Sequence, residues 1–218
     1  MIFVVVILAY LFASIPVGYI FSKWFNKTEI MKMGSKNPGA ANVISNVGPL
    51  WGISVGIIDL LIKGYFFTLL LQAMDLPEVH FNFSLIALII GHNWSLFLVL
   101  KGGRGVLTSI GVFCGLGLYL EVLILFLLLV VVGRLLIYKD SAFWTLIAII
   151  TLPVLMIVFE RELNIFYIVV TILFFVVLKR ILSNSPLSVF SRFPYTFINR
   201  IIWDRDIFNK EKWLEQKL

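Results

Sequence analysis

The chain has 218 residues, of which 61% are hydrophobic and only 14% are charged, and its formal net charge at pH 7 is +6. Its mean hydropathy is +1.02. A soluble domain carries roughly a quarter charged residues, so this composition excludes an ordinary soluble globular protein. The length suffices for one membrane domain and a short tail. We therefore expect an all-α, polytopic membrane helix bundle.

Seven segments are apolar and long enough to be read as spans, since a helix that crosses the hydrocarbon needs about 20 mostly apolar residues. The chain starts without a basic n-region or a small-residue cleavage site, which favours a first span over a signal peptide. The fourth and fifth segments are short and only Glu121 separates them, so one very long helix is the alternative. The predicted spans are residues 2–21, 50–74, 83–100, 106–120, 122–136, 142–159 and 163–178.

The charge of the connections alternates in sign along the chain. Residues 22–36 hold four lysines and one glutamate, and the tail from Lys179 holds eight basic and four acidic residues. The connections at 101–105 and 134–141 are also basic, whereas those at 75–82, Glu121 and 160–162 are acidic. Because basic loops stay in the cytoplasm, we expect the N-terminus outside and the C-terminus inside. This alternation favours the break at Glu121, because merging the two short spans would put later basic loops on the wrong side.

The first basic connection carries a run of small and polar residues at 34–43. Glycines let backbone N–H groups approach a ligand closely, and side-chain amides and hydroxyls donate hydrogen bonds without bulk. The sequence Asn-Pro-Gly within this run is also ordinary turn chemistry, so a simple turn is the alternative. The candidate ligand-binding residues are Ser35, Lys36, Asn37, Gly39 and Asn42.

The second basic connection is rich in glycine and lies before a helix. Backbone N–H groups at a helix start attract anions, and arginine can hold two phosphate oxygens at once. The candidate phosphate-binding residues are Lys101, Gly102, Gly103, Arg104 and Gly105. The alternative is a positive-inside anchor with a tight turn, and the Walker spacing of a P-loop is absent.

Three charged or titratable residues, Asp59, Lys63 and His92, fall well inside predicted spans. His92 precedes Lys101 by nine residues, which places it about 13 Å deeper along a straight helix. Ionisable groups inside bilayers are usually functional, although a packing histidine is the alternative. Asp59 and Lys63 stand four residues apart on one helix face, and we read them as a structural pair, since paired charges tolerate burial.

Five motifs together give the chain a family resemblance. They are Ser-Ile-Pro-Val-Gly-Tyr at 14–19, the run at 34–43, Asp-Leu-Leu-Ile-Lys-Gly at 59–64, Gly91-His92 and Lys-Gly-Gly-Arg-Gly-Val at 101–106. In this order they resemble the bacterial membrane acyl-phosphate:glycerol-3-phosphate acyltransferases, the PlsY family. The resemblance implies seven spans with the N-terminus outside, and transfer of a fatty acyl group from acyl phosphate to the sn-1 hydroxyl of glycerol 3-phosphate. The product would be lysophosphatidic acid, with no metal or other cofactor and no nucleic acid involved.

The resemblance also implies where the reaction occurs and which residues carry it. The protein would be a monomer in the plasma membrane, in contact with membrane lipids, with its active site on the cytoplasmic face. Ser35 and His92 would be catalytic, and Ser141 and Arg180 would join the residues of the two basic connections in binding substrate. Ser45 stands where the family has an arginine, and only Lys179-Arg180 remain of a C-terminal histidine-arginine-x-asparagine motif.

Two other functions remain as alternatives. A divergent member could use a different phosphorylated or polyol acceptor, because of the substitution at Ser45. A small transporter or a non-catalytic membrane protein is less favoured, since the specific motifs lie at one face and not at the midplane.

The tail mixes aromatic with basic residues, including Phe190, Trp203 and Trp213. This composition suits the lipid headgroup zone. We therefore divide the chain into a membrane acyltransferase-like domain, residues 1–182, and an interfacial cytoplasmic tail, residues 183–218.

Overall fold

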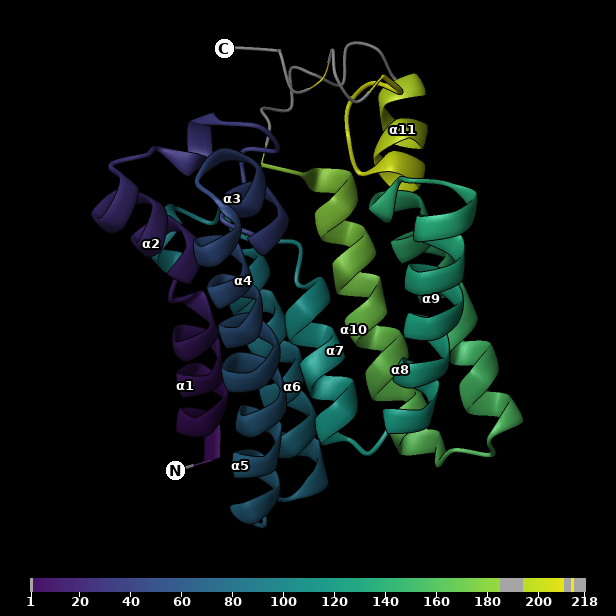
Figure 1. Ribbon diagram of the computed structural model, residues 1–218. Helices are drawn as coiled ribbons and strands as arrows, with labels where there is room; N and C mark the ends of the chain where they lie inside the picture. The colour runs from purple at the N-terminus through teal and green to yellow at the C-terminus, as the bar shows by residue number, and fades with distance from the viewer. Residues whose placement is uncertain (1, 185–193, 210–212, 214–218) are drawn as a thin grey trace.

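The computed structural model describes residues 2–184, 194–209 and 213, and these residues form a bundle of helices (Figure 1). Its described part contains no β-strand, only an isolated bridge between Ser95 and Lys101. The elements in chain order are α1 (Ile2–Ser14), α2 (Val17–Asn26), η1 (Ile30–Lys32), α3 (Ala40–Asn46), α4 (Pro49–Ile57), η2 (Ile58–Phe66), α5 (Phe67–Ala73), α6 (Glu78–Asn93), η3 (Leu96–Leu98), α7 (Val106–Gly115), α8 (Tyr119–Leu125), η4 (Phe126–Ile137), α9 (Ser141–Val158), α10 (Leu163–Leu182) and α11 (Tyr195–Trp203). The all-helical class is as expected.

Among the described residues, five helical stretches are long and apolar enough to cross a membrane, in agreement with the expected membrane helix bundle. They are Phe3–Asn26, Pro49–Ala73, Tyr119–Ile137, Ser141–Val158 and Leu163–Leu182. The third and fourth predicted spans correspond to shorter helices, α6 with 16 residues and α7 with 10. Large apolar side chains cover the outside of the bundle, as lipid contact requires; Val158 is 66% exposed and Phe174 is 59% exposed.

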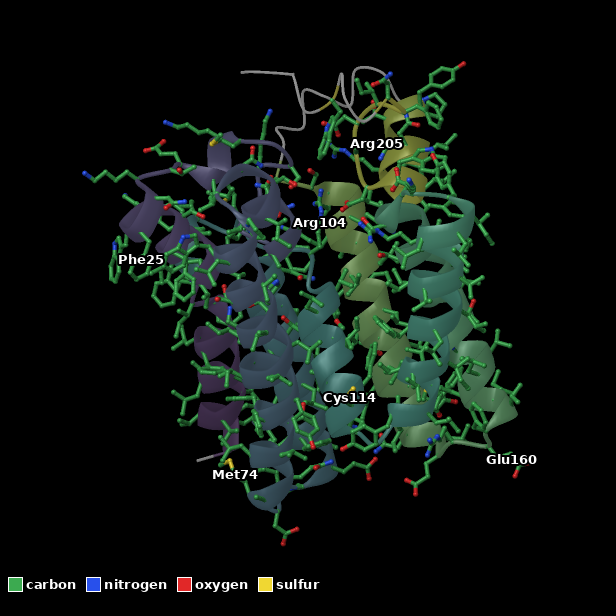
Figure 2. All side chains as sticks on the ribbon, in the orientation of Figure 1. Phe25, Met74, Arg104, Cys114, Glu160 and Arg205 are labelled. Atoms are coloured by element: carbon green, nitrogen blue, oxygen red, sulfur yellow. The ribbon has the colours of Figure 1, made fainter. Side chains whose placement is uncertain are left out.

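The basic and acidic connections lie at opposite ends of the bundle. The N-terminus of α1 lies at one end, and α3 and α11 lie at the other (Figure 1). Figure 2 shows Phe25, Arg104 and Arg205 toward the end that carries α3, and Met74 and Glu160 toward the opposite end. The connections that the charge pattern assigned to one side are therefore found together.

The break between the fourth and fifth predicted spans lies at Leu116–Leu118 and not at Glu121, so the predicted bounds were wrong there. Gly117 adopts the left-handed conformation with φ +82°. The N–H of Leu118 donates to Phe113 O and that of Gly117 to Cys114 O. These two bonds form a Schellman motif, which ends a helix at a glycine.

Glu121 lies in the first turn of α8, where its side chain is fully buried. Arg161, in the turn between α9 and α10, donates to Glu121 through Nε and through Nη2, the latter at 3.0 Å. This hydrogen bond raises the pKa of the Arg161 guanidinium. The buried carboxylate is tolerated because it has this bidentate partner.

Replacement of Arg161 by methionine should destabilise the protein by about 3 kcal/mol, because the carboxylate of Glu121 stays buried without its partner. Thermal unfolding in detergent, followed by tryptophan fluorescence, measures the change. Arg134→Met is the matched control, since the Arg134 side chain is exposed. Equal unfolding temperatures for the two variants would contradict the prediction.

Close helix contacts around η2 place the residues of the candidate site. A Cβ on Gly111 of α7 would lie 2.0 Å from Leu60 O, and one on Gly64 would lie 2.5 Å from Thr108 O. Small residues at such crossings let two backbones approach closely. The approach brings Asp59 of η2 and Thr108 of α7 to the same buried region. A small second core of Ile30, Val43 and Val55, against which Ala40 packs, anchors the polar run at 34–43.

Candidate active site

The chain turns back directly after His92, so the straight-helix prediction of about 13 Å between His92 and Lys101 was wrong. Helix α6 ends at Asn93, and the N–H of Gly103 donates to His92 O over 3.1 Å. A Cβ on Gly103 would lie 2.1 Å from His92 Nε2. The glycine at 103 is therefore needed to let the loop lie against the imidazole ring, and histidine and glycine loop form one unit.

Asp59, Lys63 and His92 form one buried cluster. Lys63 Nζ lies 3.2 Å from Asp59 Oδ1, and the distance from His92 Nδ1 to the same oxygen is 3.7 Å. His92 Nδ1 also lies 3.2 Å from the hydroxyl of Thr108. Asp59 and Lys63 belong to a π-helix, η2, and such segments are frequent at functional sites. The expected pair of Asp59 and Lys63 is present. His92, which the sequence analysis considered separately, belongs to the same cluster.

Asn42 holds the polar run at 34–43 in shape. Its side-chain Nδ2 donates to the carbonyl oxygens of Ile30, Met33 and Asn37, the last at 2.8 Å. Its Oδ1 accepts from the N–H of Ser35 at 3.1 Å. Since Asn42 is 4% exposed and fully engaged within the protein, it organises the loop that presents Ser35.

Two further residues of this run serve its backbone conformation. Asn37 Oδ1 accepts from the N–H of Gly39, which is an Asx-turn. Gly34 has φ +52°, and a Cβ there would lie 2.4 Å from Asn42 Oδ1. The run is therefore a turn and can also be a binding site, because the residues that form the turn line the cavity described below.

Asn184 connects the two polar loops, and the sequence analysis missed it. Its Nδ2 donates to Lys36 O at 3.1 Å and to Gly102 O at 2.9 Å, and its Oδ1 accepts from Lys179 Nζ at 2.8 Å. The family motif predicts an asparagine two residues after Arg180, whereas Asn184 follows it by four. The usable signal was an amide close behind the Lys-Arg pair that ends the last span.

Replacement of Asn184 by alanine should destabilise the protein by about 2–4 kcal/mol. The change removes both bridges between loops and leaves the fully buried ammonium of Lys179 without its acceptor. Asn26→Ala is the matched control, because its exposed amide makes a single bond to Val47 O. Detergent-based thermal unfolding measures both, and a loss no larger than that of Asn26→Ala would contradict the prediction.

A cavity of about 500 Å³ lies between the polar loops, the start of α9, the end of α10 and the segment after α11. Candidate residues from distant parts of the sequence line it: Ser35, Asn37, Gly39, Asn42, His92, Arg104, Gly105, Ser141 and Arg180. Asp59 and Ser45 line it as well. Its apolar lining includes Ile44, Leu107 and Val176. The cavity thus combines apolar walls with polar and cationic groups, as a site for a molecule with a hydrocarbon part and an anionic part requires.

Four of the candidate substrate-binding residues lie outside this lining. Lys101 is exposed and Lys36 is half-exposed. Gly102 and Gly103 border a separate void of about 10 Å³ beside Asp59, Lys63 and His92. Neither lysine therefore lines the cavity. Both glycines pack against His92, which does line it.

Two further arginines reach the cavity beside Arg104, each held by protein acceptors. Arg104 Nε lies 2.9 Å from Asp204 Oδ1, and its Nη1 donates to Lys179 O at 3.2 Å. Arg180 donates through Nη2 to Ala142 O at 2.7 Å. The other, Arg205, comes from the tail segment, and neither it nor Asp204 was among the predicted site residues. The tail composition indicated a membrane surface, and no motif pointed to the cavity.

Comparison with known proteins shows that the chain is similar to glycerol-3-phosphate acyltransferases. A family model described as "Glycerol-3-phosphate acyltransferase" matches residues 3–185. Glycerol-3-phosphate acyltransferase 2 of Moorella thermoacetica is 41% identical over 105 residues, which cover 48% of this chain and 53% of that protein. Glycerol-3-phosphate acyltransferase 5 of Dehalococcoides mccartyi is 38% identical, with 51% and 48% covered. The chain thus spans about half the length of these curated relatives.

Other matches are longer. Glycerol-3-phosphate acyltransferase of Pelagibacter ubique is 31% identical over 172 residues, which cover 79% of this chain and 87% of that protein. The crystal structure of PlsY (YgiH), an integral membrane glycerol 3-phosphate acyltransferase, in its glycerol 3-phosphate form covers 99% of both chains with 25% identity and a TM-score of 0.75. Its lysophosphatidic acid form gives a TM-score of 0.69 over 82% of this chain and 87% of that one, also with 25% identity.

Proposed function

Since this chain belongs to the glycerol-3-phosphate acyltransferase family, we propose that it transfers a fatty acyl group from acyl phosphate to the sn-1 hydroxyl of glycerol 3-phosphate. The products are lysophosphatidic acid and inorganic phosphate. The observation that carries the proposal is the convergence of the 34–43 run, the glycine loop and the end of α10 on one cavity of about 500 Å³. A cavity with apolar walls, hydroxyls and guanidinium groups suits an acyl chain that carries a phosphate.

The reaction determines what the protein must supply. Acyl phosphate is a mixed anhydride and is already activated, so the acceptor hydroxyl attacks its carbonyl carbon directly. The new ester C–O bond forms, the bond from the carbonyl carbon to the phosphate oxygen breaks, and phosphate leaves with that electron pair. The hydroxyl proton passes to a base. Neither a metal nor another cofactor is needed; the protein holds two phosphates together and orients the hydroxyl.

Cavity-lining residues take the proposed roles in substrate binding. Arg104, Gly105 and Arg180 bind phosphate oxygens. Ser35 and Asn37 orient the acyl carbonyl, and Ser141 contacts the acceptor, glycerol 3-phosphate. Lys36 and Lys101, outside the lining, attract the anionic substrates electrostatically.

His92 is the proposed base for the acceptor hydroxyl. It and Asp59 both line the cavity, and Thr108 lies in hydrogen-bond range of its Nδ1. Gly102 and Gly103 leave the space that the imidazole occupies, while Asn42 keeps Ser35 in position.

The proposal includes seven spans in the plasma membrane, with the N-terminus outside and the site on the cytoplasmic face. It is supported by Arg104 and Arg205, which line the cavity and lie toward the same end of the bundle as Phe25 of the first basic connection (Figure 2). The protein acts as a monomer within the lipid. Residues 1–182 form the membrane domain and residues 183–218 the interfacial tail. The tail residues 185–193, 210–212 and 214–218, Phe190 among them, lie outside the described residues.

Cysteine labelling in intact cells tests this orientation. In a Cys114→Ser background, a cysteine at Glu160 should react with a membrane-impermeant maleimide, because its loop faces outside. A cysteine at Lys32 should react only after the cells are permeabilised, since that exposed side chain belongs to a basic connection. The reverse pattern would contradict the proposed orientation.

The activity itself is tested with purified protein in detergent. Labelled palmitoyl phosphate is supplied with glycerol 3-phosphate, and in parallel with glycerol and with other polyol phosphates. Labelled lysophosphatidic acid is the expected product, and Ser35→Ala should reduce its formation by at least about tenfold. Product with another acceptor alone would replace the proposed acceptor, and no product with any acceptor would refute the transfer activity.

A further inference from the structure

The segment after α10 forms part of the cavity although it lies beyond the residues that match the family, 3–185. Helix α11 packs against α9 and α10, at the end of the bundle opposite the N-terminus (Figure 1). Trp203, Asp204 and Arg205, at and just after its end, line the same cavity as Ser35 and His92. The described part of the tail therefore contributes a wall to the candidate active site.

Buried arginines fix this segment in place. Arg180 of α10 donates from Nε to Arg200 O at 3.0 Å and from Nη2 to Ile202 O at 2.9 Å. Arg200 is 1% exposed, and it donates back through Nη1 to Ile181 O at 2.8 Å. These reciprocal bonds between α10 and α11 hold the residues that follow in a defined position.

Arg205 is the cation that this segment brings to the cavity. Its Nη1 donates to Asp140 Oδ2 at 2.6 Å, and its Nε donates to Phe208 O at 2.9 Å. A guanidinium has five N–H donors, so these two bonds fix its plane and leave Nη2 available. In the described part of the chain, Nη2 makes no hydrogen bond. It is also not one of the fully buried side-chain atoms that lack a partner, so it is accessible to a ligand. A pre-oriented guanidinium with free donors on a cavity wall is suited to a phosphate.

Two residues after the polar run at 34–43, the chain has an uncharged side chain where the family resemblance predicts a cation. Ser45, which stands at the position of the family arginine, lines the same cavity as Arg205. We propose that Arg205 binds the phosphate of glycerol 3-phosphate and so supplies, from the C-terminal segment, the positive charge that the chain lacks at Ser45. This inference rests on the proposed function and adds to it the residue that determines acceptor binding.

A purely structural role for Arg205 makes a different prediction, and Asp140 separates the two. Asp140 Oδ1 also caps α9 by accepting from the N–H of Ala142 at 2.9 Å. Asparagine retains this cap, so Asp140→Asn removes the carboxylate charge and the acceptor of the Arg205 Nη1 bond, while Arg205 keeps its own charge and its bond to Phe208 O. If Arg205 served only to pair with Asp140, both Asp140→Asn and Arg205→Gln would change the kinetics alike.

The experiment measures the steady-state constants for both substrates with four purified full-length variants: Arg205→Gln, Arg205→Gln with Ser45→Arg, Asp140→Asn, and Arg134→Gln as an exposed control. Arg205→Gln should raise the KM for glycerol 3-phosphate by about 10- to 100-fold, as expected for loss of a charge-assisted hydrogen bond. The KM for palmitoyl phosphate should change by less than about threefold. Ser45→Arg should recover most of the loss in the double variant. Asp140→Asn leaves the guanidinium charge in place, so it should raise the acceptor KM by less than about threefold.

An unchanged acceptor KM in Arg205→Gln, with an active wild-type protein, overturns the inference and leaves the proposed function standing. Equal effects of Arg205→Gln and Asp140→Asn, or failure of Ser45→Arg to restore acceptor binding, also overturn it. A second measurement covers variants that fold poorly or turn over slowly. Glycerol 3-phosphate, and not glycerol, should raise the unfolding temperature of the wild type and of the double variant but not that of Arg205→Gln. The absence of any transfer by the wild type refutes the function itself, and the inference with it.

Discussion

Replacement of Asn42 by alanine is expected to reduce acyl transfer by at least about 100-fold, because the polar run at 34–43 then loses its internal support. The side chain joins three carbonyl oxygens and the N–H of Ser35 in one buried network. Its removal leaves several backbone groups without a partner, at a cost of about 2–5 kcal/mol. Displacement of Ser35 by about 1 Å suffices for a rate loss of this size. Transfer assays and thermal unfolding of the purified variant measure both effects.

Asn46→Ala is the matched control for this prediction. Asn46 is the same residue type one turn later on α3, and its amide donates to Asn42 O and Oδ1 over 3.0 Å. Because the bonds from Asn42 to Ser35 and to the three carbonyl oxygens remain without Asn46, its removal should reduce transfer by less than about tenfold. Similar losses in both variants would show that Asn42 has no special role in holding the loop.

Replacement of Lys63 by leucine is expected to destabilise the protein by about 3–5 kcal/mol, since the change leaves the carboxylate of Asp59 charged and buried. Asp59 is 4% exposed and Lys63 is 3% exposed. Lys63 Nζ also donates to Ala13 O at 3.2 Å and to Ile15 O at 2.6 Å. These carbonyls lie where α1 ends, just before Pro16, which has no N–H of its own to continue the helix. The lysine therefore holds both the cluster and the end of the first helix.

Two further variants define this effect by unfolding in detergent. Lys32→Met removes an exposed lysine whose partner Glu29 is also exposed, and it should leave the unfolding temperature unchanged. Asp59→Asn combined with Lys63→Leu should recover part of the stability, because no buried charge remains unpaired. A double variant that is as unstable as Lys63→Leu would show that the helix-end carbonyls, and not Asp59, account for the loss.

Several features of the site could be predicted from the sequence because each depends on neighbours along the chain. The glycine run at 101–105 and the polar run at 34–43 stand out as local composition, and both contribute residues to the cavity. The pairing of Asp59 with Lys63 follows from their spacing of four residues, which places them on one face. The short helix α7 was also anticipated, although its end was not, since Gly117 adopts a positive φ in a hydrogen-bonded turn that the charge pattern does not reveal.

The sequence by itself determined that this protein is a helical membrane bundle with its basic connections on one side, because apolar length and loop charge act locally. Only the tertiary structure decided which polar groups meet. The contact of His92 with Gly103 depends on the reversal at Asn93, the bridge of Asn184 joins loops more than 80 residues away, and Arg205 reaches the cavity because buried bonds hold α11 to α10. Such contacts are set by hydrogen bonds and close packing between segments distant in the chain, and neither hydropathy nor charge counts report them.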